Sequence, residues 1–396
     1  MERYCDRYHK IYAANNIFKM KKVLSLLFIL SAAFFFLSGF TDKSHKPAAP
    51  FKNQNIKASV WPEANELFRK DKRWLGGDGA YTIDLGKGRI LWLFGDSFIA
   101  TDDSRDRKKA IFIRNSVAIQ KGYDPVSAEI RFYWGSKNDK PSSFFSESNG
   151  EWYWPGHGIV LEGKLIVFLM RIRQSKDFFD VTGWTARMVE NPSASPEKWI
   201  LKELDTPRSR FGIIIGSAAV IRQDDYVYAF SVDPLDDHPV FLVRWPVDVF
   251  FQGFLKNPMW WTGEKSGWRR QYQLKSRPPP IFSRGQMEFS VHFDKQRKLF
   301  LQVQTKSFWD SDLALRWSKN LTGPWSEPIS IYRPAESGIP EFAIYAGKAH
   351  PELAGADLIA TYVVNTFDYD RLFDHSSIYY PIFLKISLGS LTGTSP

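Results

Sequence analysis

Residues 79–96 read GAYTIDLGKGRILWLFGD, with a polar turn at residues 86–88 between two strand-like segments. The second segment, residues 90–94, is wholly apolar, is too short for a helix and has glycine close on both sides. Such a run is typical of a buried strand, and the tight turn before it predicts a β-hairpin. The same layout of short strand, polar turn and stronger strand occurs four more times along the chain.

The five hairpins are spaced regularly enough to be repeats of one unit. Equivalent points on their second strands lie 59 to 74 residues apart: Leu91, Leu165, Tyr226, Leu299 and Leu358. A third apolar stretch follows the hairpins, so each unit has three or four strands. Five such units predict an all-β fold, a five-bladed β-propeller with long loops. A two-sheet β-sandwich is the alternative.

Composition agrees with an all-β domain. The 396 residues are 44% hydrophobic and 16% aromatic, and aromatic residues favour strands and ring-binding clefts. We expect the third strand of the first repeat at residues 111–113 and a turn or two of helix within residues 62–70. The single cysteine, Cys5, excludes a disulfide framework and a cysteine-ligated metal site. The sequence also lacks the signatures of nucleotide-binding loops, zinc proteases and α/β-hydrolases.

The N-terminal segment has the pattern of an export signal. Basic residues at 19–22 precede an apolar run at residues 23–40. An uncleaved anchor is the alternative, because 18 apolar residues are at the lower limit for crossing a membrane. We expect a signal peptide or anchor at residues 1–40, a linker at 41–58 and the propeller at 59–396. The protein would then be secreted, periplasmic or on the cell surface, with membrane contact only through an uncleaved N-terminal segment.

The net charge of +10 does not indicate a nucleic-acid-binding protein. Acidic residues alternate with the basic ones, as in residues 102–107. This pattern is typical of a solvated surface, whereas nucleic-acid binding needs a basic patch or stripe. We therefore expect no nucleic-acid partner.

Five segments resemble segments of known five-bladed propeller families. Residues 74–81 and 91–98 are similar to the opening blade of a five-bladed propeller family long catalogued as a domain of unknown function, which includes mycobacterial endo-D-arabinanases. Residues 113–116 resemble the segment that follows in that family. Residues 321–328 and 349–353 are similar to strands of more distant glycosidases of the arabinanase and β-xylosidase type. The resemblance implies a propeller over roughly residues 70–390 and a glycosidase-like activity, although the fold also hosts unrelated functions.

Two aspartates of the first repeat are candidates for acid–base chemistry. Asp78 lies nine residues before Lys87, and Asp96 lies nine residues after it. In a hairpin that turns about Lys87 without a bulge, these side chains face each other on one side of the sheet, with Cβ atoms about 4.5–5.5 Å apart. Two carboxyl groups so close cannot both ionise cheaply, and glycoside hydrolysis uses such a pair. The alternative is that Asp96 accepts backbone hydrogen bonds in a turn.

Other polar residues at the starts of inner strands are expected near the same central mouth. Glu288 begins the fourth repeat, where an acid on an apolar strand needs a wet cavity or a partner. It is a third candidate catalytic carboxylate or, alternatively, a structural hydrogen-bonding group. His157, His350 and Glu352 are candidates for binding substrate. The resemblance implies that His350 contacts a carboxylate, a sugar hydroxyl or an ion on the axis, and a satisfied inner-strand histidine is the alternative.

Three further residues are candidates for binding substrate. The resemblance implies that Arg114 and Asn115 lie near the mouth, and outward-facing strand residues are the alternative. Aromatic pairs between blades are more often core than binding surface, but Trp154 is the best candidate for stacking on a sugar ring.

Three functions remain open from the sequence. The first is an exported glycoside hydrolase that cuts a furanoside or another cell-wall polysaccharide, with Asp78 and Asp96 as reacting groups. The second is a non-catalytic propeller that binds glycan or protein, and the third is a membrane-tethered assembly protein. The expected partner is a polysaccharide or oligosaccharide. We expect no cofactor and no catalytic metal, with a structural ion in the central channel as the one alternative.

Overall fold

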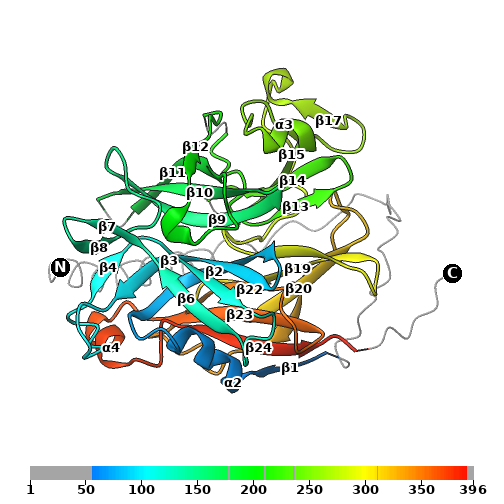
Figure 1. Cartoon of the computed structure of the whole chain (residues 1–396). Helices are drawn as coiled ribbons and strands as arrows, with labels where there is room; N and C mark the ends of the chain where they lie inside the picture. The colour runs from blue at the N-terminus through cyan, green and yellow to red at the C-terminus, as the bar shows by residue number, and fades with distance from the viewer. Residues whose placement is uncertain (1–55, 177–178, 209–210, 235–236, 310, 390–396) are drawn as a thin grey trace, which may run out of the picture.

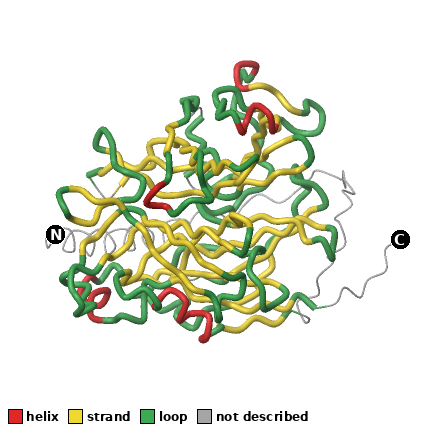
Figure 2. Tube along the Cα trace, viewed as in Figure 1, coloured by secondary structure: helices red, strands yellow, loops and turns green. Residues whose placement is uncertain are grey.

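The structure, a computed structural model, describes residues 56–389 except 177–178, 209–210, 235–236 and 310. The strands form five antiparallel sheets of four or five strands and one two-stranded hairpin. The five sheets lie in a ring, and the described helices are short segments between strands (Figures 1 and 2). The all-β prediction of a five-bladed β-propeller is therefore confirmed, and the sandwich is excluded.

The first two blades are continuous sheets that run outward from the central axis in chain order. Blade 1 contains β2 (Trp74–Gly86), β3 (Arg89–Ile99), β5 (Ser116–Lys121) and β6 (Glu129–Tyr133), with β4 (Ile111–Ile113) also paired to β3. The two-stranded hairpin that follows consists of β7 (Gly135–Lys137) and β8 (Lys140–Ser142). Blade 2 contains β9 (Glu151–Leu161), β10 (Lys164–Gln174), β11 (Phe179–Val189) and β12 (Leu201–Glu203).

Blades 3 and 4 continue the same pattern. Blade 3 contains β13 (Val220–Gln223), β14 (Tyr226–Val232), β15 (Val240–Pro246), β16 (Met259–Trp261) and β17 (Trp268–Arg270). Blade 4 contains β18 (Ser290–Asp294), β19 (Leu299–Thr305), β20 (Leu313–Ser318) and β21 (Ile329–Tyr332). The helical segments are α2 (Pro62–Asn65), η2 (Glu66–Arg69), η3 (Pro196–Lys198), α3 (Val247–Phe251), η4 (Gln271–Gln273) and α4 (Tyr369–Asp374).

Blade 5 is completed by a strand from the other end of the domain. It contains β22 (Ala343–Ala349), β23 (Leu358–Asn365) and β24 (Pro381–Ser387), and β1 (Lys57–Val60) pairs with β24 as the outermost strand. The first strand of each blade contacts the first strands of both neighbouring blades, which closes the ring. The strand β1 begins two residues before the domain boundary expected at residue 59.

Burial on both faces explains why the second strands are apolar throughout. In β3, Ile90, Trp92 and Phe94 belong to the core between blades 1 and 5, whereas Leu91 and Leu93 belong to the core between blades 1 and 2. Successive side chains of a strand point to opposite faces, so a sheet between two others needs apolar residues at every position. The five points taken as equivalent all lie in second strands, which confirms the register of the repeats.

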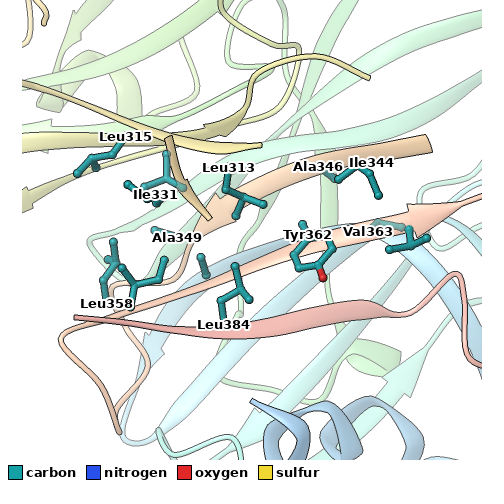
Figure 3. Close-up of a cluster of buried hydrophobic side chains, with 14 of the residues drawn as sticks. Leu313, Leu315, Ile331, Ile344, Ala346, Ala349, Leu358, Tyr362, Val363 and Leu384 are labelled. Atoms are coloured by element: carbon teal, nitrogen blue, oxygen red, sulfur yellow. The ribbon is translucent and has the colours of Figure 1, made fainter. Parts of the chain in front are cut away.

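Each neighbouring pair of blades shares one hydrophobic cluster among the described residues. Figure 3 shows the cluster between blades 4 and 5, with Leu313 and Leu315 of β20 above Tyr362 of β23 and with Ile344 of β22 to the right. These interfaces hold the blades at fixed angles around the axis. The inner strands therefore place their polar residues at defined points of the central mouth.

The expected signal peptide or anchor, residues 1–40, lies outside the described residues. In the part of the chain that the structure describes, no helix is both long enough and apolar enough to cross a membrane.

Candidate active site

The two aspartates of the first blade lie level with each other on neighbouring strands. Asp78 is in β2 and Asp96 is in β3, and the ladder between these strands is irregular on both sides of Gly79. The hairpin is therefore not free of bulges, but the register shift before Gly79 is reversed by the shift after it. The flanking pairs keep one register: Gly77 with Ser97, and Tyr81 with Leu93. A Cβ atom at Gly95 would collide with the Asp78 carboxyl group, so glycine at this position leaves room for that side chain.

The surroundings of Asp78 favour its protonated form on balance. Burial, and next the negative charges of Asp96 and Glu288, raise the pKa of Asp78 to about 8. The hydroxyls of Tyr345 and Tyr379 donate to its Oδ2 atom at 2.7 and 3.3 Å, which offsets part of the shift. At neutral pH this carboxyl group holds a proton that it can donate.

Asp96 has a different set of neighbours, although it is also largely buried. The indole Nε1 of Trp154 donates to its Oδ1 atom at 2.7 Å, and the Arg114 guanidinium donates to its Oδ2 atom at 3.2 Å. Burial raises the pKa of Asp96 to about 6, while Arg114 and Trp154 oppose that rise. Asp96 is therefore mostly ionised at pH 7, and both oxygens already have donors that stabilise a negative charge.

Glu288 enters the same cluster from the segment before β18. Its Oε1 atom lies 3.3 Å from the Nζ atom of Lys348, and the Glu288 side chain is 19% exposed against 1% for Lys348. The lysine also donates to the carbonyls of Gly79 and Ala346. Burial lowers the pKa of Lys348, and Glu288 opposes this shift. The ion pair links blades 4 and 5 to the strand that carries Asp78.

The structure thus brings together five of the residues selected from the sequence: Asp78, Asp96, Glu288, Arg114 and Trp154. Sequence reasoning missed four other residues that act on this cluster: Tyr345, Lys348, Tyr379 and Glu147. Glu147 belongs to this group because its charge raises the pKa of Asp96. Tyr345 and Lys348 lie on the inner strand of the last blade, so a search for polar residues along each inner strand would have found them. Glu147 and Tyr379 lie outside the strands, and no local pattern marks them.

His157, His350 and Glu352 form a second network, centred on Thr82 of β2. The Thr82 hydroxyl donates to Glu352 at 2.9 Å and lies 2.9 Å from Nδ1 of His350. His157 contacts the Thr82 carbonyl through Nε2 and accepts from the Val220 amide through Nδ1. Burial is the main cause that lowers the pKa of both histidines and raises the pKa of Glu352 to about 7. These side chains tie inner strands to one another, and substrate binding by them stays a prediction.

Asn115 is fully buried beside the mouth rather than open to it. Its side-chain nitrogen donates to the carbonyls of Phe145 and Tyr153, and its oxygen accepts from the Phe145 amide at 2.7 Å. The amide therefore fixes the loop after β8 against the first and second blades. A contact between Asn115 and substrate stays a prediction.

The described residues contain no group of three His, Cys, Asp or Glu side chains arranged to hold a metal ion. Both ring nitrogens of His157 and of His350 already contact protein atoms. An ion on the central axis also stays a prediction.

Fold and site together define a five-bladed β-propeller with a cluster of carboxyl groups at the inner end of its first blade. The chain belongs to the family described as "Domain of unknown function (DUF5005)", whose model matches residues 62–388. The family of unknown function indicated by the first-blade motif is thereby confirmed.

Solved structures share the fold. A putative hydrolase from Bacteroides ovatus superposes with a TM-score of 0.65 at 15% identity, over 84% of this chain and 90% of that one. The catalytic domain of a Coprinopsis cinerea GH62 α-L-arabinofuranosidase has a TM-score of 0.41 at 11% identity. That comparison covers 80% of this chain and 92% of the other. No curated protein matches the chain in sequence. The first of these likenesses shows the fold alone, so function is argued below from the side chains of the site.

Proposed function

We propose that this protein is a glycoside hydrolase that cuts a polysaccharide at the mouth of the propeller. The observation that carries the proposal is the pair of partly buried carboxyl groups on β2 and β3, which have unlike surroundings. Asp78 lies among other acids and two tyrosine hydroxyls, whereas Asp96 accepts from a guanidinium and an indole. Glycosidases use such a pair, in which one carboxyl group is protonated and the other is charged.

Each residue of the pair then has a defined task. Asp78 donates its proton to the oxygen of the leaving sugar as the glycosidic bond breaks. The reacting carbon of the sugar becomes positively charged as this bond breaks. The Asp96 carboxylate either bonds to that carbon as nucleophile or takes a proton from the water molecule that attacks it. Arg114 and Trp154 hold the Asp96 carboxylate in place. Burial, together with the negative charges of Asp96 and Glu288, keeps the proton on Asp78. The resemblance of the first-blade motif favours an arabinofuranoside in a cell-wall polysaccharide as substrate.

The test is a polysaccharide screen with detection of new reducing ends. Asp78→Asn and Asp96→Asn keep the shape of each side chain but remove its proton chemistry. Each substitution should lower activity by at least about 10²-fold, the low end for a positioned acid or base. Asp103→Asn, at an exposed position on the same blade, is the matched control and should keep full activity.

Thermal unfolding of each variant separates loss of chemistry from loss of fold. Wild-type rates in both Asn variants would refute the mechanism. The protein would then be treated as a non-catalytic propeller that binds glycan or protein through the same mouth.

We also propose that the protein is exported, so that it meets its substrate outside the cytoplasm. The basic and apolar pattern of residues 19–40 supports this proposal.

A further inference from the structure

A cluster of two exposed aromatic rings and one partly exposed ring lies beside the candidate active site. Phe308 and Trp309 follow β19, and Phe367 follows β23 in the next blade. Ring centroids are 5.3 Å apart for Phe308 and Trp309 and 5.5 Å apart for Trp309 and Phe367. Phe308 is 37% exposed and Trp309 is 38% exposed, so these rings leave much of their surface to solvent.

The cluster is continuous with the carboxyl pair through Tyr345. The Phe308 ring stacks on the Tyr345 ring, with centroids 5.0 Å apart and planes 26° apart. The hydroxyl of that tyrosine donates to Asp78 at 2.7 Å. The Ile344 amide donates to the Phe308 carbonyl at 2.8 Å, which fixes the loop after β19 against β22. A ligand at the carboxyl pair therefore has an aromatic surface next to it on the Asp78 side.

Core packing does not account for this arrangement. Single exposed apolar residues are common on proteins, but adjoining exposed rings beside a polar site mark a binding surface. A flat ring offers a large apolar contact area with little loss of conformational freedom. The apolar C–H face of a sugar ring fits such a surface, while its hydroxyl groups remain at the edge in water.

We propose that Phe308, Trp309 and Phe367 form a subsite that stacks on a sugar unit of the polysaccharide next to the bond that is cut. This inference rests on the proposed function, because it takes the same chain of sugars to occupy the carboxyl pair. In this arrangement, the sugar unit next to the bond that is cut lies on the Asp78 side of the mouth. Longer chains are then bound more tightly and cut faster than chains too short to reach the rings.

Binding is measured by retardation in native gels that contain arabinan, xylan or galactan. All proteins carry Asp78→Asn, so that the polymer is not cut during the run. Adding Trp309→Ala should weaken the apparent affinity for the retarding polymer by about tenfold, whereas Trp309→Phe should keep most of it. Tyr272→Ala is the matched control, because Tyr272 is a 70% exposed aromatic residue in η4 on the third blade.

Cleavage of oligosaccharides from the same polymer gives a second measurement. In the background with Asp78 intact, the ratio of kcat/KM for long over short chains should fall in Trp309→Ala and stay unchanged in Tyr272→Ala. A substitution that only disturbed the fold would lower kcat/KM for long chains and kcat/KM for short chains by the same factor, and their ratio would not change. Thermal unfolding checks that the variants are folded.

The outcomes separate the subsite from the hydrolase proposal. Unchanged retardation of Trp309→Ala overturns the subsite, even where the wild-type protein cuts the polymer. Failure of all three polymers to retard the protein with Trp309 intact overturns it as well. Retardation that depends on Trp309, with no cleavage of any polymer, supports the subsite and refutes the hydrolase.

Discussion

Asp78 and Asp96 show how two identical residues acquire different properties from their neighbours. Both carboxyl groups lose most of their contact with water, which favours the protonated form of each. Arg114 forms an ion pair with Asp96, whereas the negative charges of Asp96 and then Glu288 act on Asp78. The pair therefore shares one proton near neutral pH, with Asp78 as its main holder.

This difference predicts a bell-shaped pH profile for kcat/KM. Activity should fall below about pH 6, where Asp96 gains a proton, and above about pH 8, where Asp78 loses its proton. Arg114→Met removes the cation that lowers the pKa of Asp96, so the acid limb should move to higher pH. Arg131→Met, which removes an exposed ion pair with Glu197, should leave the profile unchanged. An acid limb at the same pH in Arg114→Met would contradict this assignment.

Strand β22 is the element that joins the site to the fold. Its Tyr345 contacts Asp78, and its Lys348 contacts both Glu288 and the backbone of β2 at Gly79. Lys348 is 1% exposed, and a lysine so buried is stable only with partners that satisfy its charge. The strand therefore positions groups from blades 1, 4 and 5 around one point.

Removing this lysine should destabilise the protein more than removing a surface charge. Lys348→Met leaves Glu288 and the Gly79 carbonyl without their donor, and the free energy of unfolding should fall by about 3 kcal/mol. Adding Glu288→Gln should restore part of that loss, because the unpaired charge is then removed. Denaturant unfolding measures the free energy of unfolding of the single variant and of the double variant. Lys256→Met, at an exposed ion pair, is the control. A double variant no more stable than Lys348→Met would refute the pairing.

The third strand of the first blade shows where local pattern fails. The apolar stretch expected there, Ile111–Ile113, forms β4, which pairs only with the end of β3. The third strand of the sheet is β5, which pairs with β3 from Arg89 to Phe94. Each strand contains a three-residue apolar run, Ile111–Ile113 in β4 and residues 117–119 in β5, so composition does not distinguish them. The choice depends on which stretch can pair along the full buried part of β3.

At the scale of the whole molecule, the ring is closed by pairing between the two ends of the domain. All four residues of β1 pair with β24, so the outermost strand of blade 5 comes from the N-terminal side. Without it, the edge of β24 would present unpaired backbone groups. This closure predicts that β1 contributes to stability out of proportion to its length.

Deletion of residues 1–60 should therefore destabilise the propeller, whereas deletion of residues 1–55 is the matched control. The first deletion removes the backbone hydrogen bonds of β1, each of which contributes about 1 kcal/mol, so a loss on the order of 3 kcal/mol is expected. Denaturant unfolding measures the difference between the two. Equal stability of both shortened chains would show that β1 does not close the ring.

Export is a prediction at the same scale. The mature protein from its native host should begin between about residues 38 and 50, because cleavage follows the apolar run. Mass spectrometry of the N-terminus checks this. A full-length species embedded in the membrane would refute cleavage and favour the anchor.

The sequence by itself determined the repeat, the all-β class, the number of blades and the family. These follow from short-range patterns, because turns and apolar runs are local and a sheet buried on both faces needs an apolar run. The arithmetic about Lys87 also placed Asp78 level with Asp96, although the strands between them are irregular.

Only the tertiary structure decided which other residues meet that pair. Tyr345, Lys348 and Tyr379 lie more than 240 residues beyond Asp96 in the chain, and ring closure alone brings them to Asp78. Tertiary contacts likewise decide that Asn115, His157 and His350 have hydrogen-bond partners of their own within the protein. Contacts between distant strands depend on blade angles and side-chain packing, which no local pattern in the sequence records.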